Sequence, residues 1–211
     1  MFITFEGIDG SGKSTQIERT AAWLTARGRN VLVSREPGGS RLGEAIRDIL
    51  LDPRWKEMCG RAEFFLYSAS RSQLVEEIVR PHLSKPNTAV ILDRYDDSST
   101  AYQGGGRELG LDEIETINKF ATGGLVPDLT FVLDVDWDTS LARRSNSRSG
   151  PDRLEQNAHD FFERTRTTYH ELCSRHPDRM VLIDAAQNED DVFERIQTAL
   201  LQRFARLATT A

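Results

Sequence analysis

Residues 2–15 read FITFEGIDGSGKST, a short apolar run that continues directly into a glycine-rich turn. The turn fits the pattern GxxxxGK(S/T), in which glycines allow backbone N–H groups to point inward around phosphate oxygens. A strand before the turn and a helix after it are the setting that this pattern requires, and the helix N-terminus adds a positive dipole. The sequence therefore predicts a phosphate-binding loop. The alternative is a flexible turn without a ligand, which requires chance to place these residues between a strand and a helix.

The residue types of this loop indicate how a nucleoside triphosphate is held. We expect the Lys13 ammonium at the β- and γ-phosphates and the Ser14 hydroxyl at Mg²⁺, which offsets charge during transfer of the γ-phosphoryl group. The loop alone does not separate a kinase from a GTPase switch, an ATPase motor or a phosphate-binding module. The residues predicted to bind ATP phosphates are Gly7, Asp9, Gly10, Ser11, Gly12, Lys13, Ser14 and Thr15.

Apolar runs alternate with amphipathic helical patterns along the 211 residues, which is typical of a parallel α/β sheet. The predicted strands are apolar on nearly every residue, as expected when helices cover both faces of the sheet. We predict one α/β domain, residues 1–211, with a five-stranded parallel sheet. The strands are predicted at residues 2–6, 30–34, 88–93, 129–135 and 180–184, and the helices at 13–27, 41–51, 61–83, 112–121, 139–144, 157–175 and 189–207.

Composition narrows the class of protein. The formal net charge of -6 argues against a nucleic-acid binder, because such proteins usually carry a basic excess. No apolar run approaches the roughly 20 residues that span a bilayer, and the first residues lack the basic region of a signal peptide. We therefore expect a cytoplasmic protein without membrane contacts. Cys59, Cys173 and the four histidines show no metal-ligand spacing.

The third predicted strand ends in VILDRY, residues 90–95, which brings a carboxylate and a guanidinium to the edge where open α/β sheets bind ligands. Asp93 is expected to hold Mg²⁺ through water or to position Lys13, and Arg94 to clamp a monophosphate. The alternative is a structural ion pair at a strand end. Arg35 follows the second strand and is expected at the same edge, so that two arginines converge on one phosphate.

Four segments resemble the thymidylate kinase family, and in particular its bacterial type. They are FEGIDGSGKST (residues 5–15), SREPGGSRLGEAIRDILL (34–51), LDRYDDSSTAYQGGGR (92–107) and PDLTFVLDV (127–135). The resemblance implies a P-loop nucleoside monophosphate kinase fold with a short lid at about residues 144–155. It implies transfer of a phosphoryl group from ATP to dTMP with Mg²⁺, in dTTP biosynthesis, by a homodimer.

The same resemblance implies a dTMP site. Tyr67 matches an aromatic residue that stacks on thymine, Arg71 an arginine that hydrogen-bonds the base, and Tyr102 a tyrosine that crowds the sugar 2′ position. Without the resemblance, this pattern favours a helix whose aromatic side packs in the core. The residues implied for dTMP binding are Asp9, Arg35, Tyr67, Arg71, Arg94, Ser99, Tyr102 and Gln103, with Asp9 near the 3′-hydroxyl and Ser99 and Gln103 on the base side.

Residues 143–155 read RRSNSRSGPDRLE and have the composition of a polar lid. The resemblance implies that this lid supplies a catalytic arginine, for which Arg153 in DRLE is the first candidate and Arg148 the second. The alternative is a solvated basic surface loop. Two other functions also remain open: a kinase for another nucleotide, and a regulatory module that binds a nucleotide without an acceptor.

Overall fold

A computed structural model describes residues 1–145, 159–204 and 207. Its centre is a five-stranded sheet in the order β2-β3-β1-β4-β5, in which every neighbouring pair is parallel. The strands are β1 (Phe2–Glu6), β2 (Asn30–Arg35), β3 (Thr88–Asp93), β4 (Leu129–Asp134) and β5 (Met180–Asp184). The predicted fold class and all five predicted strands are confirmed, with ends that differ by at most one residue.

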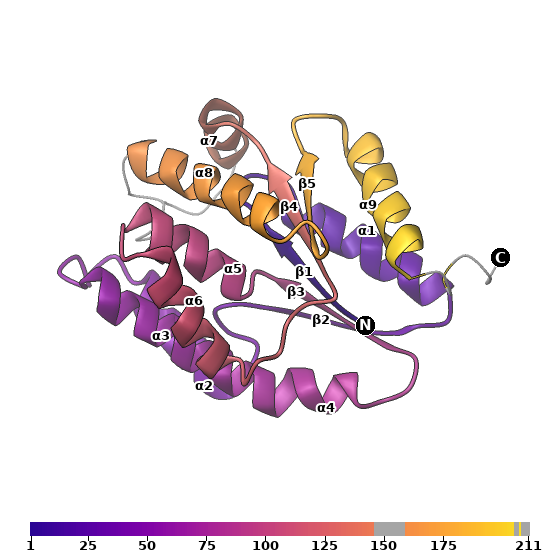
Figure 1. Cartoon of the computed structure of the whole chain (residues 1–211), viewed down its shortest axis with the longest axis horizontal. Helices are drawn as coiled ribbons and strands as arrows, with labels where there is room; N and C mark the ends of the chain where they lie inside the picture. The colour runs from indigo at the N-terminus through magenta and orange to yellow at the C-terminus, as the bar shows by residue number, and fades with distance from the viewer. Residues whose placement is uncertain (146–158, 205–206, 208–211) are drawn as a thin grey trace.

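The helices lie in the connections between the strands, and Figure 1 shows them on both sides of the sheet. They are α1 (Lys13–Ala26), α2 (Arg41–Leu51), α3 (Gly60–Leu74), the π-helical turn η1 (Val75–Val79), α4 (Arg80–Leu83), α5 (Asp96–Ser99), the π-helical η2 (Thr100–Gly106), α6 (Leu111–Ala121), α7 (Trp137–Ser145), α8 (His159–Arg175) and α9 (Glu189–Arg203).

The side chains of each strand alternate between the two faces of the sheet, and each face packs against a different set of helices. Ile3 and Ile91 are fully buried and belong to a large core cluster that includes Ile17 of α1 and Ile196 of α9. Their neighbours along the strands point the opposite way, because successive side chains of a strand face opposite sides of the sheet. Phe2, Val90 and Leu92 therefore pack in a separate cluster, against the α3 and η1 side chains Leu74, Val75 and Val79.

Two features of the helices differ from the predictions. The predicted helix 61–83 is helical throughout but is formed by α3, η1 and α4, with the wider π-helical turn in the middle. The second feature is the helical segment α5–η2, residues 96–106, which was not predicted because its serines and glycines have low helix propensity. It forms in a buried position, where Ala101 and Tyr102 join the core.

Among the residues that the structure describes, no helix combines the length and the apolar character needed to cross a bilayer.

Candidate active site

The loop between β1 and α1 folds as the glycine pattern predicts. Gly7 and Gly10 have φ of +129° and +77°, which residues with a Cβ rarely adopt. A Cβ at Gly7 would lie 2.4 Å from the Leu133 carbonyl oxygen, and a Cβ at Gly10 would lie 2.7 Å from the Ser140 carbonyl oxygen. The loop therefore needs glycine at both positions in order to pass close to the end of β4 and to α7.

Lys13 lies at the centre of this loop. Its Nζ atom donates hydrogen bonds of 3.1 Å to the carbonyl oxygens of Gly7 and Ile8, and the side chain is buried. Burial lowers the pKa of Lys13, and the nearby Arg94 guanidinium lowers it further, while Asp93 opposes both effects. The loop thus holds an ammonium group at the position where the sequence predicts the phosphates of a nucleotide.

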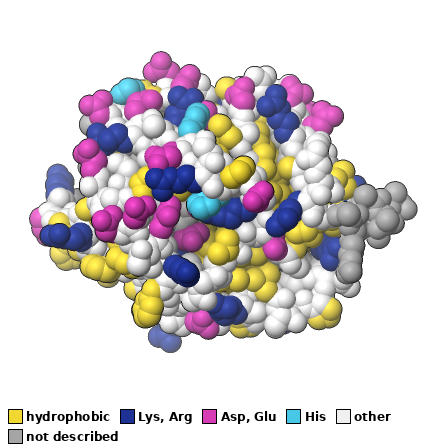
Figure 2. All heavy atoms as spheres, viewed as in Figure 1, with side chains coloured by type: hydrophobic (Ala, Val, Ile, Leu, Met, Phe, Trp, Pro, Cys, Tyr) yellow, Lys and Arg dark blue, Asp and Glu magenta, His cyan; other side chains and the backbone are white. Residues whose placement is uncertain are grey.

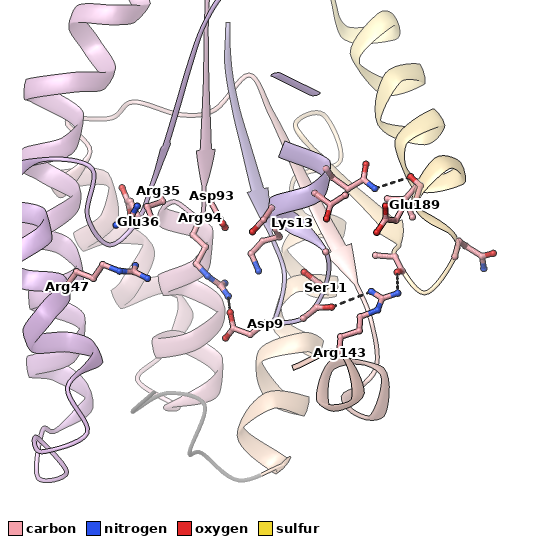
Figure 3. Close-up of a pocket in the computed structure, with 18 residues that line it drawn as sticks. Asp9, Ser11, Lys13, Arg35, Glu36, Arg47, Asp93, Arg94, Arg143 and Glu189 are labelled. Carbon is pink, nitrogen blue, oxygen red and sulfur yellow. Dashed lines mark hydrogen bonds and ion pairs between the residues drawn. The ribbon is translucent and has the colours of Figure 1, made fainter. Parts of the chain in front are cut away.

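A cavity of about 550 Å³ opens in front of the loop. Figure 3 shows Arg35, Glu36 and Arg47 on one side of it, Arg143 and Glu189 on the other, and Lys13 between them. Five cationic side chains from different parts of the chain line this cavity, which fits a highly charged anion. Its lining residues are Asp9, Gly10, Ser11, Gly12, Lys13, Ser14, Thr15, Gln16, Arg35, Glu36, Arg47, Asp93, Arg94, Arg143, Ala185, Gln187, Glu189 and Val192.

Arg94 connects the loop to a second cavity. It follows β3 with a left-handed φ of 70°, and its backbone N–H donates to the Phe5 carbonyl oxygen at 2.9 Å. The guanidinium donates to the Gly7 carbonyl oxygen at 2.9 Å and to Asp9 Oδ1 at 2.7 Å. Although burial alone would raise the pKa of Asp9, the charges of Arg94 and Lys13 hold it below its usual value.

The second cavity measures about 90 Å³ and shares Asp9, Glu36, Arg47 and Arg94 with the first. Six of the residues predicted for dTMP binding line it. Because Arg94 lines both cavities, it lies in their common wall. The complete lining is Asp9, Glu36, Pro37, Arg47, Leu51, Tyr67, Arg94, Ser98, Ser99, Tyr102 and Gln103. Of these two cavities, Arg35 lines the first and not the second, and its guanidinium is paired with Glu44 at 2.9 Å.

Arg71 lies behind the wall of the second cavity, because only 1% of its surface is exposed. Its Nε donates to Glu36 Oε2 at 2.8 Å, and its Nη2 donates to Ser99 Oγ at 3.0 Å. The two remaining bonds go to Asn118 and to the Tyr95 carbonyl oxygen. Burial raises the pKa of the Glu36 carboxyl to about 7, against the opposing charge of Arg71. Arg71 therefore reaches the cavity through Ser99 and Glu36, both of which line it.

Asp93 and Ser14 lie on the wall of the first cavity, as predicted for a Mg²⁺ site. Asp93 Oδ1 is buried and has no hydrogen-bond partner within the described part of the chain. In that part, no group of three acidic, histidine or cysteine side chains could hold a metal by itself. One carboxylate and one hydroxyl fit Mg²⁺, which usually completes its shell with substrate phosphates and water.

Comparison with known proteins identifies the family of this chain. A family model described as thymidylate kinase matches residues 5–196. The chain belongs to the thymidylate kinase family.

Its relatives in the thymidylate kinase family span the same length. The thymidylate kinase of Lactobacillus delbrueckii subsp. bulgaricus is 51% identical over 189 residues, which cover 89% of this chain and 89% of that protein. The thymidylate kinase of Thermosipho africanus is 46% identical over 198 residues, with coverage of 94% and 96%. The crystal structure of thymidylate kinase from Ehrlichia chaffeensis superposes with a TM-score of 0.76 at 31% identity, covering 95% of this chain and 97% of that one.

These matches confirm the predicted resemblance, the P-loop nucleoside monophosphate kinase fold and the predicted enzyme class, an ATP-dependent dTMP kinase. The roles of individual residues stay predictions. The structure brings the loop residues, Asp93, Arg94 and most of the predicted thymidylate-binding residues together at one sheet edge. Arg148 and Arg153, and most of the predicted lid, lie outside the described residues.

The sequence interpretation missed Arg47 and Arg143. Arg47 lines both cavities and donates to the Pro37 carbonyl oxygen at 2.9 Å. Arg47 lies four residues after the buried Gly43, which places it on the inner side of α2 and could have indicated its role. Arg143 donates to the Ala185 carbonyl oxygen at 3.0 Å and so joins α7 to the loop after β5. No local pattern distinguishes Arg143 from the other arginines nearby.

Proposed function

We propose that the two cavities bind ATP and dTMP side by side and that the chain transfers the γ-phosphoryl group between them. An oxygen of the dTMP phosphate forms a bond to the γ-phosphorus as the bond to the bridging β–γ oxygen breaks, giving dTDP and ADP. The observation that carries this proposal is the position of Arg94 in the wall common to both cavities, in contact with the Lys13 loop.

The reaction needs no general base, because the attacking phosphate oxygen is already anionic. Rate acceleration in this proposal comes from orienting the two phosphates and from neutralising their charge. Lys13 and the loop N–H groups hold the β- and γ-phosphates. Arg94, helped by Arg35 and Arg47, holds the acceptor phosphate, and Ser14 and Asp93 would hold Mg²⁺, which supplies further charge neutralisation when bound.

The proposed dTMP position places thymine against Tyr67, with Ser99 and Gln103 beside the base. Arg71 acts on the base through Ser99, to which it donates a hydrogen bond. Tyr102 then lies at the sugar and Asp9 near its 3′-hydroxyl. Support comes from the second cavity, which contains Tyr67, Ser99, Tyr102 and Gln103 on its wall. An aromatic face combined with polar groups at the edge is suitable chemistry for recognising a base.

Arg153, or else Arg148, is proposed to stabilise the transferring phosphoryl group from the lid. The support is indirect: the loop positions Ile8 to Ser11 contain no basic residue that could take this role. An arginine with this function contributes about 10³–10⁵ in rate. A single-turnover rate for Arg153→Ala within about threefold of the parent would rule out this assignment.

The proposal also includes a homodimer in the cytoplasm. Helices α2, α3 and α6 expose large apolar side chains, among them Leu42, Ile49, Phe65 and Phe120. Figure 2 shows hydrophobic side chains exposed at the lower left of the molecule, where Figure 1 draws these helices. Surface of this kind favours association between protein chains.

A coupled assay of ADP release with dTMP, dUMP, dCMP, dGMP and AMP as acceptors tests the proposed function. We expect dTMP to be the best acceptor. Arg94→Lys keeps the charge but loses the bidentate contact that a guanidinium makes with a phosphate, so kcat/KM for dTMP should fall by about 10- to 100-fold. Arg80→Lys, at an ion pair with Glu76 that lines neither cavity, is the matched control and should leave kcat/KM unchanged. Preference for a purine monophosphate would contradict the proposal.

A further inference from the structure

Glu63 is a buried carboxylate directly behind the second cavity. It lies in the first turn of α3, and none of its surface is exposed. Its Oε2 is paired with Arg107 Nη2 at 3.0 Å, and its Oε1 accepts a hydrogen bond of 2.8 Å from the side-chain amide of Gln103. The Arg107 guanidinium favours the charged form of Glu63, and in that form a carboxylate can only accept hydrogen bonds.

This chemistry fixes the orientation of the Gln103 amide. The amide must turn its NH₂ group toward Glu63, which leaves its carbonyl oxygen Oε1 on the other side of the amide plane. Gln103 is 2% exposed and lines the second cavity, whereas Glu63 does not line it. Among the described residues, the hydrogen bond of the Gln103 side chain is the one that its Nε2 donates to Glu63 Oε1. An acceptor oxygen is therefore the group that Gln103 offers to the cavity.

We infer that Glu63 is a positioning residue for base selection: it holds Gln103 with its acceptor oxygen toward the nucleobase, so that the cavity prefers a pyrimidine with a proton on N3. Thymine and uracil carry this proton, whereas N3 of cytosine is an acceptor. This inference rests on the proposed function, because it requires the base of the acceptor nucleotide to occupy the second cavity.

Without Glu63 the amide would not discriminate between these bases. A glutamine can rotate by half a turn and exchange its donor for its acceptor at little cost. With Glu63 in place, that rotation would bring the amide oxygen against a buried carboxylate oxygen and exchange a 2.8 Å hydrogen bond for a repulsive contact. The buried ion pair with Arg107 thus converts an adaptable side chain into a fixed acceptor.

The test compares the parent with Glu63→Gln, a neutral side chain of nearly the same shape that can donate or accept. Steady-state kinetics give kcat/KM for dTMP and dUMP, and competition against dTMP gives the inhibition constants of dUMP and dCMP. We expect the preference for dUMP over dCMP to fall by about tenfold, which corresponds to one mismatched hydrogen bond. Contacts to position 4 of the base are the same in both proteins, so their contribution to this change cancels.

Two comparisons separate base selection from a general effect on the fold. The ratio of kcat/KM for dTMP to that for dUMP should differ by no more than about twofold between the parent and Glu63→Gln, because both bases present the same N3 proton. The exposed pair in which Gln73 Nε2 donates to Glu77 Oε2 at 2.8 Å provides the matched control, since Glu77→Gln alters a similar bond that does not line the cavity. It should change none of the ratios.

The double variant Glu63→Gln and Gln103→Glu exchanges the two groups. The amide introduced at position 63 then donates to a carboxylate at position 103, which again offers an oxygen to the cavity, so rejection of dCMP should return. A parallel loss of activity with all substrates in Glu63→Gln, at an unchanged dUMP-to-dCMP ratio, would overturn the inference. So would a double variant that remains unselective.

If Glu63→Gln does not fold, Glu63→Asp provides the same comparison, because its shorter side chain no longer reaches Gln103. Failure of both variants to fold, judged by thermal unfolding, would assign Glu63 a purely structural role and overturn the inference. A parent protein that phosphorylates another nucleotide and not dTMP would instead refute the proposed function. The dUMP-to-dCMP ratio is measured independently of that result by competition binding.

Discussion

At the scale of single residues, the buried Glu6 makes the free energy of unfolding depend on pH. Its buried carboxylate accepts hydrogen bonds from Ser98, Tyr169 and the Tyr95 N–H. Burial, together with the charge of Asp97, raises the pKa of Glu6 from 4.5 to about 7. An acid whose pKa is higher in the folded state binds protons on folding, so the free energy of unfolding declines as the pH rises from about 4.5 to about 7. Glu6→Gln removes this titration. Between about pH 5 and about pH 8 the parent should therefore lose about 2 kcal/mol more stability than the variant, measured by urea unfolding.

Glu36, a second buried acid with a pKa raised to about 7, is present in both proteins, so its contribution cancels in this comparison. An equal pH dependence in the parent and in Glu6→Gln would contradict the prediction.

At the scale of elements, the contact between η2 and α8 sets the position of the residues that line the second cavity. A Cβ at Gly105 would lie 1.9 Å from Thr168 Oγ1 and 2.9 Å from Thr168 Cβ, so η2 approaches α8 at a distance that only glycine allows. We expect Gly105→Ala to lower the free energy of unfolding by about 1–3 kcal/mol, because the two elements must separate. Thr168→Ala in the same chain should restore part of this loss, since it removes the nearest atom. Denaturant unfolding measures both effects.

Gly60→Ala is the control for this substitution, because a Cβ there has its nearest neighbour at 3.5 Å, an ordinary contact. It should leave stability within about 0.5 kcal/mol of the parent. If Gly105→Ala were as stable as Gly60→Ala, the close packing of η2 against α8 would not limit the position of the cavity wall.

At the scale of the whole molecule, the exposed apolar side chains of α2, α3 and α6 predict self-association. Phe120 is 89% exposed and Phe65 is 56% exposed, and Leu42 and Ile49 lie seven residues apart on one side of α2. We expect the parent to sediment as a dimer and Phe65→Glu to sediment as a monomer, because a charge in an apolar interface is costly. Leu141→Glu, at an exposed position on α7, should remain a dimer. A monomeric parent, or a dimeric Phe65→Glu, would contradict this prediction.

The sequence by itself determined the features that depend on neighbours along the chain. Short apolar runs bounded by turns specify the five strands, and the glycine pattern specifies the loop around Lys13. Because parallel strands end at the same edge, the positions of Asp93 and Arg94 at the end of their strand also followed from the sequence. The physical reason is that backbone conformation and burial periodicity are local properties.

Only the tertiary structure decided which distant side chains meet. Arg71 is fully buried because Glu36, far away in the sequence, accepts its Nε hydrogen bond at 2.8 Å. Glu63 accepts a hydrogen bond from Gln103 across 40 residues, and Gly105 and Gly106 of η2 pack directly against α8. These contacts depend on how elements pack, and packing energy between distant residues leaves no periodic pattern in the sequence.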